Sequence, residues 1–160
     1  MTLSDWDLFD IETYDPRRPV PNSTSYMFGL HSFYDGPCAM DYDPAVHAED
    51  LGIPVIYRSD LPEPDMVAGF SLRFQAIFML PNLHSAVERC ALAHEIVHWE
   101  RQDEHDTQGA DDRADRIAAR RLIRPSRIRE AAEAGNDYGR IALELNVTEK
   151  IMELFVRSYG

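Results

Sequence analysis

Small and apolar residues recur at helical spacing from residue 85 onward, with polar positions between them. One side of a helix repeats every three to four positions. The stripe that this period selects comprises Ala86, Val87, Cys90, Ala93 and Val97. Ser85 is followed by Glu88 at the spacing of a capping box, which is typical of a helix start. The pattern therefore predicts a helix from Ser85 to about residue 101 with one buried face.

The chain before this helix has the pattern of a short helix and several strands. Asp43 followed by Pro44 is typical of a helix start and predicts a helix over 44–51. Three β-rich or alternating segments predict strands within 53–57, 66–74 and 76–80. We interpret the last of them as an edge strand, to which an extended peptide adds through main-chain hydrogen bonds.

The chain after residue 101 is helical in its periodicity. After a polar loop, a helical pattern runs from Ala110 to Pro125, and shorter helices are expected over 126–134 and 138–145. Thr148 is a suitable cap for a last helix. That helix carries Ile151, Met152, Phe155 and Val156. The sequence thus predicts an α+β fold, mainly helical, with a small antiparallel sheet of about three strands beside the helix that begins at Ser85.

Residues 1–40 differ from the rest of the chain, because they contain Asp-Pro, Arg-Pro and Val-Pro steps and no sustained period. We expect them to form an extended or poorly ordered arm. The remaining residues, 41–160, are expected to form one domain that ends in a pair of helices. A chain of 160 residues is of ordinary size for one domain.

The charge balance limits the partners that this protein can have. Sixteen basic residues against twenty-eight acidic ones give a net charge of -12, which disfavours direct binding to nucleic acid. The alternative of DNA binding rests on 141–159, where two short helices meet much as in a helix-turn-helix. No apolar run approaches the ~20 residues that span a bilayer, so we expect no membrane association. An acidic N-terminus and only two cysteines favour the cytoplasm.

The helix that begins at Ser85 contains the pattern HExxH, at His94, Glu95 and His98. An α-helix turns once in about 3.6 residues, so two histidines four apart project from one face and can bind one cation. A glutamate beside them is suited to accept a proton from water. The pattern therefore predicts a zinc hydrolase in which Glu95 is the catalytic base.

A catalytic zinc usually has three protein ligands, so a third is expected from the next helix. Asp111 is the preferred candidate, because a short loop places the start of that helix beside His98. Asp112 takes its place if the helix has a different phase. Asp115 lies one turn further on, where its carboxylate can accept the ring N–H of His94 and hold the tautomer that binds metal.

Other candidate ligands are weaker. Cys90 lies one turn before His94 but is expected to be a small core residue. A metzincin carries its third histidine where this chain has Glu104, and His105 is expected to be a solvated loop residue. The remaining histidines have no partner at ligand spacing and are expected to be incidental. They are His31, His47 and His84.

The chain resembles the ImmA/IrrE family of metallopeptidases, in the form seen in actinobacteria and their phages. Two blocks carry the resemblance, Glu88 to His98 and Asp111 to Ile123, and it extends loosely over about 44–158. It implies a zincin-like domain in which His94 and His98 bind zinc and Glu95 is the base. The family's third ligand is a Glu at the position of Asp111, and an aromatic residue is usual at Ile117. Both positions depart from the family pattern.

The resemblance also implies a function. Family members cut helix-turn-helix transcriptional repressors and so relieve repression, which makes a zinc-dependent metalloendopeptidase with such a repressor as its substrate the preferred interpretation. Asp111 in place of Glu leaves an alternative open. The chain is then a weak or inactive zincin-like protein that regulates a partner by sequestering it.

Overall fold

The computed structural model describes residues 41–159, apart from 104–106, 134 and 136. The expected arm at 1–40 lies outside these residues, as do Glu104 and His105. The described chain has six helices and one three-stranded sheet, which confirms the α+β, mainly helical fold. None of the described helices is both long and apolar enough to cross a membrane.

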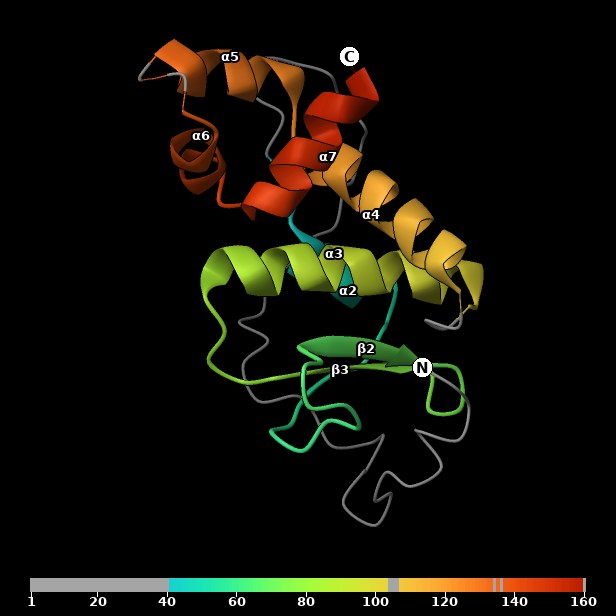
Figure 1. Ribbon diagram of the computed structural model, residues 1–160. Coiled ribbons are helices and arrows are strands. Elements are labelled where there is room, and N and C mark those ends of the chain that lie inside the picture. Colours follow the sequence, from blue (N-terminus) through green and yellow to red (C-terminus); the bar gives the residue numbers. More distant parts are fainter. Residues whose placement is uncertain (1–40, 104–106, 134, 136, 160) are drawn as a thin grey trace.

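Helix α3 (Ser85–Arg101) lies in the middle of the molecule, with the sheet on one side and the later helices on the other (Figure 1). Its two apolar faces explain this position. Leu92 and Ile96 pack in a cluster with sheet residues, whereas Cys90 and Ala93 pack in a second cluster with residues of the later helices. Because α3 is covered on both sides, polar groups along it are held in a largely buried environment.

The sheet consists of β1 (Val55–Tyr57), β2 (Ala68–Ser71) and β3 (Ala76–Met79), in the spatial order β1-β3-β2. Strand β2 pairs with β3 in antiparallel register, and β1 pairs with β3 in parallel register. The expectation of a purely antiparallel sheet was therefore wrong in one of its two pairings. All four residues of β2 and all four of β3 are buried.

The expectation that the strand at 76–80 is an edge strand was also wrong. The chain reverses tightly between β2 and β3, where Gln75 has a φ of 48°, and so places β2 directly beside β3. Strand β1 occupies the other side of β3. Within the described residues β3 is therefore central, β1 and β2 are the edge strands, and β2 contacts α3.

The starts of two helices were predicted from local sequence signals, and the structure confirms one of these signals and not the other. Helix α2 (Pro44–Asp50) begins as expected, with Asp43 accepting the N–H of Ala45 at 2.9 Å. The capping box expected for α3 was wrong, because the ring of His84 caps this helix by accepting the N–H of Ala86. Ser85 is instead the first helical residue, and its hydroxyl donates to the side-chain oxygen of Asn146.

The four remaining helices lie within about three residues of their predicted positions, and the first of them lies against α3 and the last one. They are α4 (Gln108–Leu122), α5 (Pro125–Glu133), α6 (Tyr138–Glu144) and α7 (Glu149–Tyr159). Thr148 caps α7, as expected, by accepting the N–H of Ile151. Ile151, Met152 and Phe155 are buried in the cluster shared with α3 and α4. Helix α7 therefore closes the core on the side of α4 that faces away from the sheet (Figure 1).

Candidate metal centre

The two histidines of the HExxH pattern lie on successive turns of α3 and face each other. The Nε2 atoms of His94 and His98 are 3.0 Å apart, and the ring centroids are 4.8 Å apart. The side chain of His98 is almost fully enclosed, with 1% of its surface exposed, whereas that of His94 is 14% exposed. The local geometry of the helix alone thus directs two imidazole nitrogens to one point.

Asp111 joins this pair from the first turn of α4, which begins beside the carboxyl end of α3 (Figure 1). Its Oδ1 atom is 3.4 Å from the Nε2 of His98 and 3.9 Å from the Nε2 of His94. The neighbouring Asp112 is exposed and accepts a hydrogen bond from Gln108 on its own helix. The phase of α4 therefore brings Asp111, and not Asp112, to the two rings.

The separations of these three atoms fit a zinc ion. Ligands at about 2.0–2.1 Å from a tetrahedral metal lie about 3.3 Å from one another. The separations here are 3.0, 3.4 and 3.9 Å, and two imidazoles with one carboxylate are a donor set that zinc favours. The shorter side chain of aspartate reaches the site because the start of α4 lies close to α3. The departure from the family's Glu thus leaves the donor set complete.

Asp115 lies one turn after Asp111 and contacts the outer nitrogen of His94, with Oδ1 2.8 Å from Nδ1. Its other oxygen is 2.7 Å from the ammonium of Lys150 on α7. Burial raises the pKa of Asp115, but the hydrogen bond to His94 and the contact with Lys150 outweigh burial and lower the pKa to about 2. An ionised Asp115 accepts the Nδ1 proton of His94 and leaves its Nε2 as the metal-facing atom.

Asp103 makes the equivalent contact with His98, and the sequence analysis missed it. Its Oδ1 atom is 2.6 Å from the Nδ1 of His98. Gln102 ends α3 in the left-handed conformation with a φ of 53°, and the N–H of Asp103 then bonds back to the carbonyl of His98 at 3.1 Å. This Schellman-type ending returns Asp103 to the turn that carries His98. Glycine or asparagine at 102 would have signalled it, and glutamine does not.

Glu95 follows His94 in α3 and reaches toward the sheet. It is 3% exposed, and its Oε2 accepts the backbone N–H of Phe70 in β2 at 2.8 Å. The N–H of Ile77, opposite Phe70, donates to Pro54 on the β1 side, so the Phe70–Ile77 pair exchanges no ladder bonds. The N–H of Phe70 therefore faces away from β3, and it fixes one oxygen of the Glu95 carboxylate.

The other candidate ligands have structural roles. Cys90 is buried and accepts the N–H of Thr148 at 3.4 Å, which confirms it as a core residue, and burial is the main factor that raises the pKa of its thiol. His84 caps α3, and the Nδ1 of His47 is 2.9 Å from the hydroxyl of Tyr42. These two histidines therefore have contacts within the fold that the sequence analysis did not predict. His31 lies outside the described residues.

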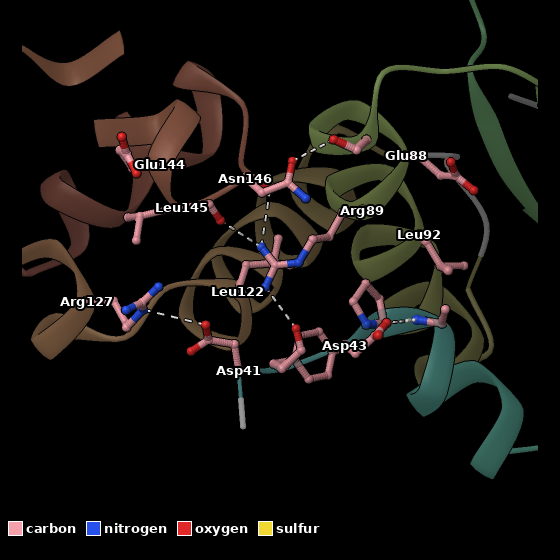
Figure 2. A pocket seen from close by; sticks show the side chains of 14 residues that line it. Asp41, Asp43, Glu88, Arg89, Leu92, Leu122, Arg127, Glu144, Leu145 and Asn146 are labelled. Carbon is pink, nitrogen blue, oxygen red and sulfur yellow. Dashed lines mark hydrogen bonds and ion pairs between the residues drawn. The ribbon is translucent and has the colours of Figure 1, made fainter. Parts of the chain in front are cut away.

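A hollow of about 440 Å³ beside the amino-terminal half of α3 is lined by none of the residues of the imidazole site. Figure 2 shows Arg89 pointing into it. The guanidinium donates to the carbonyls of Leu145 and Asn146, at 3.1 and 3.2 Å, and to that of Tyr42 at 2.9 Å. Because its guanidinium donates to three backbone carbonyls, Arg89 connects α3 to the residues that precede α2 and to the turn between α6 and α7.

Two observations indicate the class of this protein. Its domain is α+β and mainly helical, and it brings the two histidines of the HExxH pattern together with a carboxylate from the next helix. The model of a peptidase family, described as the IrrE N-terminal-like domain, matches residues 48–156, which is more than half of the chain. The chain belongs to this family, and its function is of the metallopeptidase type. The resemblance to the ImmA/IrrE family is thereby confirmed. No curated protein and no solved structure gave a match.

Proposed function

We propose that this protein is a zinc-dependent metalloendopeptidase in which His94, His98 and Asp111 hold the metal. The observation that carries the proposal is the convergence of three ligand atoms within 4.8 Å of one another. Each imidazole is also oriented from behind by its own carboxylate, Asp115 for His94 and Asp103 for His98. Such paired carboxylates are typical of histidines that bind a catalytic metal.

Zinc held by two imidazoles and a carboxylate supplies Lewis acidity, which activates water for attack and polarises a peptide carbonyl. Glu95 is the proton acceptor in this proposal. The N–H of Phe70 holds its Oε2 in place, so the carboxylate keeps one orientation while it takes the proton of the attacking water. Glu95 then delivers this proton to the nitrogen of the departing amine.

The peptide substrate is proposed to lie along β2. Because the Phe70–Ile77 pair exchanges no ladder bonds, the main-chain groups of Ala68 and Phe70 face away from β3. The N–H of Phe70 already donates to Glu95, so an extended peptide on this side of β2 pairs with the main-chain groups of Ala68 and with the carbonyl of Phe70. Replacing Ala68 with proline removes one such N–H and no bond to β3, so it is expected to raise KM with little change in stability.

The substrate is proposed to be a helix-turn-helix transcriptional repressor, whose cleavage relieves repression in the cytoplasm, in an actinobacterium or its phage. Family membership supports a protein substrate. A net charge of -12 supports recognition of a repressor as a protein rather than through DNA. The presence of only two cysteines, of which Cys90 is free and buried, is consistent with a reducing compartment.

The test is incubation of the zinc-loaded protein with the repressor encoded beside it. Wild-type protein is expected to cut the repressor, and Glu95→Gln is expected to bind one equivalent of zinc but to cut about 100- to 10,000-fold more slowly. Asp112→Asn is the matched control, since Asp112 is exposed and accepts a hydrogen bond from Gln108 on its own helix. Cleavage that persists unchanged in Glu95→Gln contradicts the proposed mechanism.

The alternative is a protein that sequesters its partner without cutting it. Asp111 in place of the family's Glu is the observation that favours it. Stable binding of the repressor by wild type and Glu95→Gln alike, with no cleavage by either in the presence of zinc, would establish this alternative.

A further inference from the structure

Lys150, in the first turn of the last helix, reaches the back of the metal centre. Its Nζ is 2.7 Å from Oδ2 of Asp115, whose other oxygen contacts the Nδ1 of His94. The lysine side chain is 70% exposed, whereas that of Asp115 is 12% exposed. A surface cation thus ends a chain of contacts that runs through one buried carboxylate to a proposed zinc ligand.

The position of this lysine is fixed by its own helix. Thr148 caps α7 two residues earlier, and the following residue, Ile151, is 3% exposed in the core shared with α4. Helix α4 carries Asp115 and packs directly against α7. The packing of α7 against α4 therefore determines whether the ammonium of Lys150 contacts the carboxylate of Asp115.

The charges around the imidazoles give the contact its importance. Three carboxylates lie within 4 Å of the two rings, from Asp103, Asp111 and Asp115. Lys150 places a positive charge against one of them, Asp115. Exposed ion pairs usually contribute little, but a pair with one buried partner is screened less by water and salt.

We propose that Lys150 is a positioning residue for metal binding, which holds Asp115 in the orientation that accepts the Nδ1 proton of His94. This inference rests on the proposed function, since it assigns His94 to the metal. It makes zinc affinity depend on the docking of the last helix, which lies about 55 positions beyond the HExxH pattern and contains none of the proposed ligands.

The experiment measures zinc dissociation constants by competition with a chromophoric chelator at fixed pH. Lys150→Met keeps most of the aliphatic stem and removes the charge, and it is expected to weaken zinc binding about 3- to 10-fold, less than loss of the carboxylate itself. Lys150→Arg is expected to stay within about twofold of wild type. Arg157→Met is the matched control, because it removes another exposed cation of α7 that pairs with Glu153 and not with Asp115.

Two further measurements separate positioning from a general effect on stability. In an Asp115→Asn background, Lys150→Met is expected to change the zinc dissociation constant by less than about twofold, because its route of action is already removed. Raising the ionic strength from about 0.05 M to about 1 M is expected to shrink the difference between wild type and Lys150→Met, since the exposed ammonium is screened.

The possible outcomes distinguish this inference from the proposed function. If wild type binds zinc and Lys150→Met binds it equally well, the inference is overturned while the metal site stands. An equal effect of Lys150→Met in the Asp115→Asn background also overturns it. If wild-type protein binds zinc but does not cut protein, the proposed peptidase function fails and the role of Lys150 remains supported by its effect on affinity. If wild type binds no zinc, both fail.

Discussion

Replacing Asp103 with asparagine tests whether the carboxylate behind His98 supports metal binding. In the structure this carboxylate is 2.6 Å from the Nδ1 of a histidine whose side chain is 1% exposed. An ionised partner fixes the Nδ1–H tautomer and makes the opposite nitrogen a stronger ligand. Asparagine keeps the size of the side chain but not its charge, so the imidazole loses its anionic acceptor.

The expected size of the effect follows from exposure and contacts. Loss of a carboxylate behind a metal-binding histidine usually costs about 10- to 100-fold in affinity, or about 1.4–2.7 kcal/mol. The side chain of Asp103 is 28% exposed, whereas that of Asp115 is 12% exposed and also contacts Lys150. We therefore expect Asp103→Asn to lie near the tenfold end and Asp115→Asn nearer the hundredfold end.

The assay is zinc competition against a chelator of known affinity, with circular dichroism to verify the fold of each variant. Asp112→Asn is the control, because it removes an exposed charge on α4 without touching either ring, and it is expected to bind zinc within about twofold of wild type. Equal zinc affinity of wild type and Asp103→Asn would refute the reasoning. So would an effect of Asp112→Asn as large as that of Asp103→Asn.

Three further predictions concern the ligand, the clamp at Arg89 and acid stability. Asp111→Glu is expected to weaken zinc binding about tenfold, although Glu is the residue that the family has at this position. The reason is that Oδ1 of Asp111 already lies 3.4 Å from the Nε2 of His98, and an added methylene displaces the carboxylate. Tighter zinc binding in the same chelator assay would contradict this prediction. Arg89→Met removes donors to three backbone carbonyls and is expected to lower the free energy of unfolding by about 2–4 kcal/mol in urea titrations, with no change in zinc affinity per folded molecule. In the metal-free protein, the pKa of Asp115 is about 2 against its ordinary 3.8, so the stability it contributes is complete above about pH 4 and is lost as pH falls toward 2. The expected contribution is about 2 kcal/mol, and Asp115→Asn should remove this part of the pH dependence of unfolding; an unchanged acid transition would show that Asp115 is not held ionised.

The arrangement of Asp111 explains why one departure from the family pattern is compatible with a complete site. The sequence analysis left open that a side chain one methylene shorter makes the protein weak or inactive. The separations among Asp111, His94 and His98 match those of ligands on one tetrahedral ion. The structure therefore brings the aspartate within ligand distance of both imidazoles, and the cleavage assay tests catalytic competence.

Features fixed by contacts within one helix were predictable from the sequence. His94 and His98 share a face because they are four residues apart, and helical periodicity placed α4, α6 and α7 within about three residues of their observed positions. The cap of α7 at Thr148 was predictable for the same reason, since a hydroxyl before an apolar helical pattern satisfies the first backbone N–H groups.

Only the tertiary structure decided which groups from other elements complete the site. The phase and approach of α4 selected Asp111 over Asp112, and the left-handed ending of α3 at Gln102 brought in Asp103. The pairing of β3 on both sides made it the central strand and left β2 at an edge, and the packing of α7 supplied Lys150. Helical periodicity is set by local backbone geometry, which a sequence displays directly. Contacts between elements depend on how the backbones are placed relative to one another. A shift of one residue in the phase of a helix, or a single tight turn, is enough to change that placement.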